Sequence, residues 1–297
     1  MRNGKRLTWD WEDFASPDFG RYDRKGIPEV ILANRKTIDQ SLAIARAFLE
    51  RTGRAILSRV DPGLEARLRE EFAGTAELDW RPGCRGAVLR AAGAAARPWG
   101  ATPARTGGRV GILTAGTSDI PAAEEAAMIA REMGCEVFAA NDVGVAGLHR
   151  LLDPLREMLE EHDVDVLVAA AGMDGALPSV VAGLATVPVV GLPTSVGYGH
   201  GGDGEAALSA MLQSGSPGLC VVNIDNGVGA GGIAGMIANR AARAREPSHA
   251  HRPAERRPAA PESATRRSAA RKGAARKAPA RKAASRKAPA RKPRTTS

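Results

Sequence analysis

The sequence predicts an α/β protein whose larger part is a mostly parallel sheet with helices on both faces. Its 297 residues are 43% hydrophobic but only 4% aromatic, a composition that suits a tightly packed parallel sheet. Short apolar runs predict strands, and each run leads through a Gly-rich or polar turn into a helical stretch. This alternation is typical of right-handed βαβ units. The five predicted strands span 109–114, 136–140, 165–170, 187–192 and 219–224.

A small α/β or α+β domain is predicted to precede this sheet, over residues 1–84. Aliphatic residues at a spacing of three to four predict an amphipathic helix over 37–51, and a strand follows over 55–60. Clustered Gly and Pro residues indicate a linker over 85–108, with one short apolar element at 87–92. The catalytic domain is therefore expected over 109–244.

The net charge of +9 sums two very different segments. Residues 246–297 carry 16 Lys and Arg against 3 Glu, a charge of +13 that leaves −4 for residues 1–245. Arg-Lys pairs recur every five residues among Ala, Pro, Gly and Ser, which predicts a disordered tail over 245–297. The tail is expected to bind nucleic acid or another polyanion through phosphate attraction, or else to act as a solubilising extension without a dedicated partner.

Two classes of protein are excluded by what the sequence lacks. There is no run of about 18 apolar residues and no apolar signal core at the start, so we expect neither a membrane protein nor an exported one. Cys84, Cys135 and Cys220 lie far apart without a CxxC pair, which favours neither a zinc site nor a disulfide framework. A cytoplasmic protein is expected.

The loop after the first predicted strand is a candidate phosphate site. Its backbone amides, from Gly116 onward, precede a helix, and the Thr117 and Ser118 hydroxyls could join them in binding phosphate. Asp119 could orient a hydroxyl or hold a metal-bound water. The alternative is an ordinary helix N-cap without a ligand.

The loop after the third strand offers a carboxylate. Gly172 and Gly175 flank Met173 and Asp174 and would let the backbone approach a ligand closely. A carboxylate at the end of a strand is well placed as an acid, base or nucleophile. Asp174 could instead cap the next helix.

The fourth strand leads into a glycine-rich loop that resembles a binding loop. Pro193 begins it, and Tyr198, Gly199 and His200 lie further along. His200 could donate a proton, or it could be an incidental loop histidine.

The loop after the fifth strand carries Asn223, Asp225 and Asn226 and could bind ribose or diphosphate. Its spacing differs from the dinucleotide GxGxxG pattern. Because ligands of parallel sheets bind at the carboxyl ends of the strands, four such loops together predict one binding crevice for a nucleotide.

Motifs at 109–121, 141–150, 172–179 and 222–227 resemble those of pyridinium-3,5-biscarboxylic acid mononucleotide synthases, the LarB-type family of nickel-pincer cofactor biosynthesis. The resemblance covers 109 to about 243 and continues upstream at 24–31 and at Lys36 and Thr37. It implies a catalytic domain resembling aminoimidazole ribonucleotide carboxylase, with a three-layer flavodoxin-like fold and a symmetric homo-oligomer.

The family's reaction uses nicotinic acid adenine dinucleotide, CO2 or bicarbonate, Mg2+ and water, and yields the biscarboxylated mononucleotide and AMP. For an enzyme of this kind we expect Ser118, Asp119 and Asp142 to contact phosphate, ribose or Mg2+, and Gly144 to contact the substrate. The alternative within the same fold is a purine-pathway carboxylase or mutase. That enzyme carries a His where this chain has Ala176.

This chain departs from the synthase pattern at two catalytic positions. The pyridinium ring is electron-poor and carboxylates only after a nucleophile adds para to nitrogen. In the family a cysteine supplies that nucleophile, and its position corresponds to Gly215 here, while the family's glutamate corresponds to Asp174. Cys220 is expected as a buried, inert strand thiol that could replace the missing group only if its loop rearranged. The second hypothesis is therefore a catalytically weakened nucleotide-binding protein tethered to nucleic acid by its tail.

Overall fold

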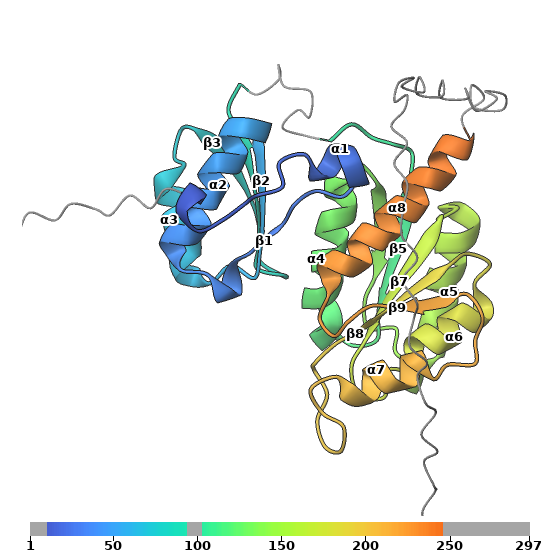
Figure 1. Ribbon diagram of the computed structural model, residues 1–297. Coiled ribbons are helices and arrows are strands. Elements are labelled where there is room, and N and C mark those ends of the chain that lie inside the picture. Colours follow the sequence, from blue (N-terminus) through green and yellow to red (C-terminus); the bar gives the residue numbers. More distant parts are fainter. Residues whose placement is uncertain (1–10, 94–102, 246–297) are drawn as a thin grey trace, which may run out of the picture. The chain divides into compact units, whose positions relative to one another are not determined.

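The computed structural model describes residues 11–93 and 103–245. Residues 246–297 of the predicted basic tail and residues 94–102 of the predicted linker lie outside these residues. The described chain forms two sheets, one of four strands and one of five (Figure 1).

The first sheet belongs to the N-terminal domain. Its first two strands pair in parallel and its other pairs are antiparallel. In spatial order the strands are β1 (Ile31–Leu32), β2 (Arg54–Ser58), β4 (Gly86–Ala91) and β3 (Ala76–Arg81). The helices of this domain are α1 (Arg21–Lys25), α2 (Ile38–Thr52) and α3 (Pro62–Glu71).

Helix α2 has clear sequence-encoded ends. The Thr37 hydroxyl accepts a hydrogen bond from the Gln40 amide, and the Gln40 side chain accepts one from the Thr37 amide, so its first turn is capped. Its last turn ends at Gly53, whose φ of 77° is left-handed. The apolar face of α2 packs on the sheet through buried Leu42, Ala45 and Phe48.

Strand β4 lies inside the segment that the sequence indicated as linker. Its backbone pairs with both β2 and β3, and Val88 and Leu89 are fully buried. The N-terminal domain therefore continues to Ala91, because the short apolar element at 87–92 completes its sheet. The predicted boundary at 84 cuts through the turn that joins β3 to β4.

The second sheet confirms the predicted parallel α/β fold. All of its neighbouring strand pairs are parallel. Counted along this domain, the strand order is 2-1-3-4-5, the order of flavodoxin-like folds. In spatial order the strands are β6 (Glu136–Ala140), β5 (Arg109–Thr114), β7 (Val166–Ala171), β8 (Val189–Pro193) and β9 (Leu219–Val221).

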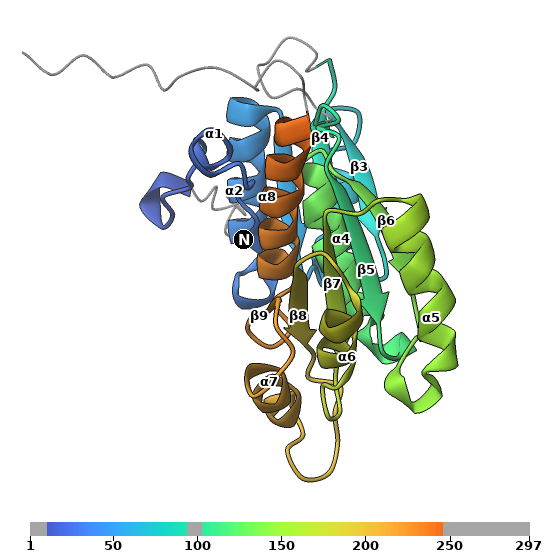
Figure 2. The ribbon, with the colours of Figure 1, turned by 90° about the vertical axis from the view of Figure 1, so that its right-hand side faces the viewer.

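Helices cover both faces of this sheet. Helices α4 (Ile120–Glu132) and α8 (Gly227–Arg245) pack together on one face, where a Cβ on Gly231 would lie 2.3 Å from the Ala126 carbonyl oxygen. The other face carries α5 (His149–Arg156), α6 (Leu177–Leu184) and α7 (Glu205–Leu212). Figure 2 shows the strands between α8 and α5. Within the described residues, every helix is too short or too polar to span a bilayer.

The N-terminal sheet packs against α4. Ile56 and Val88 share one buried cluster with Ala127 and Met128 of that helix. Beside them, buried Glu132 accepts hydrogen bonds from Arg54 at 2.9 Å and from Arg90 at 2.5 Å. Burial lowers the pKa of Arg54, although Glu132 opposes this shift. These contacts hold the start of β2 near the end of α4.

Candidate functional site

The main cavity lies at the carboxyl ends of β5 and β7, with a volume of about 530 Å3. The connections from these neighbouring strands run in opposite directions along the sheet, to β6 and to β8, which makes this edge the topological switch point. Four loops contribute to its lining. The lining residues are Ala115, Gly116, Ser118, Asp119, Gly144, Val145, Ala146, Arg150, Ala171, Gly172, Met173, Asp174, Ala176, Leu177, Val196, Tyr198, His200 and Ala206.

Asp119 ties three of these loops together. Its Oδ1 accepts hydrogen bonds from the Gly172 amide at 2.9 Å and the Thr194 hydroxyl at 2.5 Å. Its Oδ2 accepts one from the Gly116 amide at 2.8 Å. The side chain is 4% exposed. Asp119 therefore positions the loops after β5, β7 and β8, where the sequence suggested catalysis or metal binding.

Ser118 lies exposed at the start of α4 and borders the main cavity. The preceding residue, Thr117, is also exposed but does not line the cavity. A 3-10 turn over Thr117–Asp119 leads directly into α4. The Ser118 hydroxyl is therefore the group of this loop best placed to meet a phosphate.

Asp142 is held by an arginine. Its backbone is left-handed, with φ 61°, and its amide donates to the Thr114 hydroxyl at 3.1 Å. Its Oδ2 accepts a hydrogen bond from Arg150 Nη1 at 2.6 Å. Arg150 and Gly144 line the cavity, whereas Asp142 does not. The sequence analysis did not single out Arg150, although Arg150 is the last residue of the motif at 141–150.

The two carboxylates predicted to hold Mg2+ do not form a metal site. Both oxygens of Asp119 already accept hydrogen bonds from protein donors, and Asp142 is paired with Arg150. Across 11–93 and 103–245, no three His, Cys, Asp or Glu side chains cluster as metal ligands. In the described part of the chain, the two predicted carboxylates therefore do not fit a protein-held Mg2+, and the ion stays a prediction of the resemblance.

Asp174 lines the main cavity on an exposed turn. Its Oδ1 accepts a hydrogen bond from the Ala176 amide at 3.2 Å, which leaves Oδ2 without a hydrogen bond in the described structure. Met173 beside it is 48% exposed and has a left-handed φ of 51°. This turn therefore presents a carboxylate and a thioether to the cavity.

The flanking glycines serve protein packing. A Cβ on Gly172 would lie 2.9 Å from Thr194 Oγ1, and one on Gly175 would lie 2.6 Å from the Ala207 carbonyl oxygen. A Cβ on Gly144 would lie 2.5 Å from the Ala115 carbonyl oxygen. The close approach that the sequence suggested toward a ligand is thus made toward neighbouring loops and α7.

The loop after β8 supplies the rim of the cavity. Val196, Tyr198 and His200 line it, and Tyr198 is 78% exposed. Gly199 has a left-handed φ of 74°, and a Cβ added there would meet no atom within 4 Å. Pro193 is buried at the end of β8, where its carbonyl accepts the Asp225 amide, and does not line the cavity.

The predicted residues after β9 separate into two roles. The Asn226 side chain accepts a hydrogen bond from the Gly229 amide at 2.9 Å and caps α8, and the Asn223 side chain accepts one from the Ile224 amide at 2.9 Å. Asp225 Oδ1 accepts the Ser195 amide at 2.9 Å and its carboxylate borders a second cavity. Strand β9 ends at Val221, short of the predicted end at 224, because the backbone turns before α8 and no longer pairs with β8.

The second cavity, of about 300 Å3, adjoins the main one. Ser118 and Val196 line both. Arg59, which follows β2 of the N-terminal sheet, reaches it from the other domain, and no local pattern in the sequence signalled this. Its other lining residues are Cys84, Pro121, Ala122, Glu125, Thr194, Ser195 and Asp225.

The cysteines do not line the main cavity. Cys220 is exposed on β9, which corrects the expected buried thiol, because β9 is an edge strand. Partial desolvation still raises the pKa of Cys220. Gly215 is exposed, and a Cβ added there would meet no atom within 4 Å.

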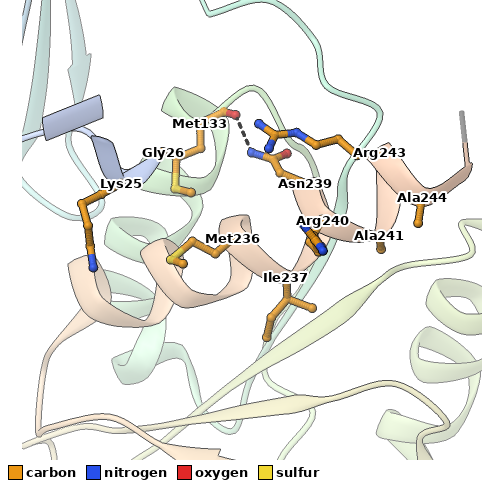
Figure 3. A pocket seen from close by; sticks show the side chains of 10 residues that line it. All are labelled: Lys25, Gly26, Met133, Met236, Ile237, Asn239, Arg240, Ala241, Arg243 and Ala244. Atoms are coloured by element: carbon orange, nitrogen blue, oxygen red, sulfur yellow. Dashed lines mark hydrogen bonds between the residues drawn. The ribbon is translucent and has the colours of Figure 1, made fainter. Parts of the chain in front are cut away.

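A larger groove, of about 650 Å3, runs along the end of α8 (Figure 3). Lys25, Met133, Met236 and Arg240 are among its lining residues, and the Asn239 side chain donates to the Met133 carbonyl at 3.0 Å. Gly108, just before β5, packs against Ala238 and Asn239. This groove therefore lies toward the amino ends of the strands and is not the predicted crevice.

Comparisons with known proteins agree with this architecture. A family model described as AIR carboxylase matches residues 109–259, and one described as LarB/PurE-like N-terminal domain matches residues 10–88. An uncharacterized protein of Methanocaldococcus jannaschii is 40% identical over 229 residues, covering 76% of this chain and 85% of the relative.

Shorter relatives match a smaller part of the chain. The N5-carboxyaminoimidazole ribonucleotide mutase of M. jannaschii is 36% identical over 118 residues, 39% of this chain and 69% of the relative. The mutase of Thermotoga maritima is 31% identical over 132 residues, 43% of this chain and 74% of the relative. With one family model covering half of its length and the N-terminal match beside it, the chain belongs to the AIR carboxylase family and carries a LarB/PurE-like N-terminal domain.

Proposed function

We propose that this chain carboxylates the pyridinium ring of nicotinic acid adenine dinucleotide and releases AMP, yielding pyridinium-3,5-biscarboxylic acid mononucleotide. Membership of the AIR carboxylase family supports an enzyme with a nucleotide substrate. The observation that carries the finer proposal is the lining of the main cavity. Asp174, His200 and Arg150 border it, while Ala176 stands where a mutase-type site would carry its histidine.

The chemistry requires a temporary nucleophile. We assign this role to His200, the imidazole that lines the cavity, because the cysteine position of the synthase pattern is Gly215. Neutral imidazole adds to the ring carbon para to nitrogen and turns the pyridinium into a dihydropyridine. The adjacent ring carbon then attacks CO2 and forms the new carbon–carbon bond.

Asp174 completes the cycle as a base. It takes the proton from the newly carboxylated carbon, after which the ring nitrogen expels the imidazole and the pyridinium is restored. In a separate step, water adds to the phosphorus on the nicotinate side, the phosphoanhydride bond breaks, and AMP leaves. The Arg150 guanidinium is suited to the carboxylate and phosphate charges.

The test is a product assay on the full chain. Purified protein is supplied with the dinucleotide, 13C-bicarbonate and Mg2+, and products are identified by mass. We expect AMP together with a mononucleotide heavier by one labelled carboxylate. His200→Gln and Asp174→Asn should each lower kcat by about 100-fold or more, while exposed Glu205→Gln, outside both cavities, should not.

The mutase reaction is the alternative that the relatives' names suggest. It is assayed on the same preparation with N5-carboxyaminoimidazole ribonucleotide. Ala176 cannot carry a proton, so we expect no conversion. Turnover of that ribonucleotide, with none of the dinucleotide, would replace the proposal by the mutase function.

A second activity is proposed for the basic tail at 246–297, on its charge of +13. Its Lys and Arg side chains bind nucleic acid through phosphates without reading base sequence. DNA affinity should fall steeply between 50 and 200 mM salt, by about 1,000-fold or more. A chain ending at Arg245 should lose this binding and keep its turnover. Equal DNA binding by both chains would refute the role of the tail.

A further inference from the structure

The second cavity is built by both domains. Arg59 and Cys84 come from the N-terminal sheet, whereas Ser118, Ser195 and Asp225 come from loops at the carboxyl edge of the parallel sheet. The main cavity and this one meet at Ser118 and Val196. A molecule longer than a mononucleotide, with its phosphates at Ser118, therefore has room on both sides.

The Arg59 guanidinium is held by two contacts and keeps N–H donors that could bind a ligand. Its Nη2 donates to the Asp225 carbonyl oxygen at 2.6 Å, and its Nε lies 3.7 Å from Glu125 Oε1. A guanidinium carries five N–H donors. In the described structure, its Nη1 makes no hydrogen bond, and the side chain is 39% exposed. These donors suit a phosphate oxygen.

The backbone at Arg59 is held in an unfavourable conformation. Its φ of 58° is left-handed, which costs a non-glycine residue about 1 kcal/mol or more and occurs often at ligand sites. Ser58, just before it, donates a hydrogen bond to buried Glu125 of α4, whose other oxygen accepts the Val228 amide of α8. Glu125 thus fixes the end of β2 to the parallel-sheet domain and aims Arg59 at the cavity.

The remaining polar groups suit a ribose. The Ser118 and Ser195 hydroxyls can donate or accept, and Asp225 Oδ2 has no hydrogen bond in the described structure, so it can accept from a sugar hydroxyl. Pro121, Ala122 and Val196 give the cavity an apolar wall for a base. Together these groups match the chemistry of a nucleoside monophosphate.

We propose that the second cavity binds the nucleoside monophosphate half of the dinucleotide, and that Arg59 is the specificity-determining residue that favours a dinucleotide over a mononucleotide. This assignment rests on the proposed function for the identity of the substrate. The nicotinate half occupies the main cavity, and the phosphate of the departing AMP faces Arg59. The N-terminal domain then acts in substrate selection.

The test measures binding to the full chain without turnover. Isothermal titration gives the Kd of AMP, alone and with nicotinic acid mononucleotide at saturation. We expect AMP to bind in both cases, because the two ligands occupy different cavities. Arg59→Asn should weaken AMP by about tenfold or more and leave the mononucleotide unchanged. Asparagine is chosen because it tolerates the left-handed backbone.

Arg85 provides a matched control. It is exposed, has a left-handed φ of 50° and lines neither cavity. Arg85→Asn makes the same chemical change on the same type of backbone and should leave both affinities unaltered. Thermal unfolding of both variants checks that each is folded, and Arg59→Lys supplies a second variant if Asn fails to fold.

The outcomes separate the two proposals. The second-cavity assignment is overturned if AMP binds only in the absence of the mononucleotide. It is also overturned if AMP binds with equal affinity to the wild type and the Arg59 variants. Dinucleotide turnover by a chain that does not bind AMP overturns it as well. Arg59-dependent AMP binding by a chain that makes no carboxylated product supports the assignment and rejects the proposed reaction.

Discussion

The carboxylate of Asp119 accepts a hydrogen bond from the Gly172 amide at 2.9 Å, which joins the loops that follow β5 and β7. The same oxygen accepts the Thr194 hydroxyl, and the other accepts the Gly116 amide. Three loops that form the main cavity are thus positioned by one buried acid. Asp119 is therefore a positioning residue, which acts on the site by holding these loops in place.

Asp119→Ala should cost about 3–5 kcal/mol of unfolding free energy, because it leaves two buried donors and one half-buried donor without an acceptor. Urea denaturation measures this loss, with exposed Thr117→Ala as the control expected within about 0.5 kcal/mol of wild type. A loss below about 1 kcal/mol for Asp119→Ala would show that the hydrogen bonds do not hold the loops.

Only one of the three cysteines should react rapidly with a thiol reagent in the native protein. Cys220 is exposed, whereas Cys84 and Cys135 are buried. Ellman's reagent at pH 8 should modify one thiol per native chain and three in denaturant. Cys220→Ser should remove the fast reaction, and its persistence in that variant would contradict the exposure of this strand.

Alkaline pH should destabilise the fold through its buried thiols. Burial raises the pKa of Cys84 to about 11 and that of Cys135 to about 12 from an ordinary value of 9.0. Above pH 9 the unfolded chain releases these protons first, so the free energy of unfolding falls until the folded pKa values are reached. Each thiol should contribute a loss of about 1 kcal/mol by pH 10.

The measurement is urea denaturation at pH 8, 9 and 10 under reducing conditions. A Cys84→Ala, Cys135→Ala double variant should lose about 2 kcal/mol less over this range than wild type. Identical pH profiles for the two proteins would mean that the thiols ionise as easily in the folded chain as in the unfolded one.

Restoring a cysteine at Gly215 should not raise activity. The position is exposed, with open space around a Cβ, and it does not line the main cavity. Gly215→Cys should fold normally and keep the wild-type kcat for the carboxylated product, and it should not rescue His200→Gln. Rescue would place the turn after α7 at the pyridinium ring and remove the nucleophile role from His200.

Most of the parallel sheet was predictable because its strands are continuous apolar runs. The predicted spans 109–114 and 136–140 coincide with β5 and β6. The linker assignment at 87–92 and the buried Cys220 were wrong for the same reason: local sequence does not show which strands pair with each other. The short run at 87–92 became β4 because β2 and β3 flank it, and Cys220 is exposed because β9 has a neighbour on one side only.

The site was predictable only as far as it follows strand ends. Ser118, Asp174 and Tyr198 follow different strands and line one cavity, since parallel strands bring their carboxyl ends to one edge. Arg59 could not be found in this way, because it reaches the site by packing of the N-terminal sheet on α4. The engagement of Asp119 by three protein donors likewise depends on the assembled loops.

The most direct test of the account follows the label from 13C-bicarbonate into product with nicotinic acid adenine dinucleotide as substrate. We predict one labelled carboxylate on the pyridinium mononucleotide for each AMP released by the wild type, and loss of the labelled product in His200→Gln. AMP release without label, or labelled product that His200→Gln forms at the wild-type rate, would contradict carboxylation by this site.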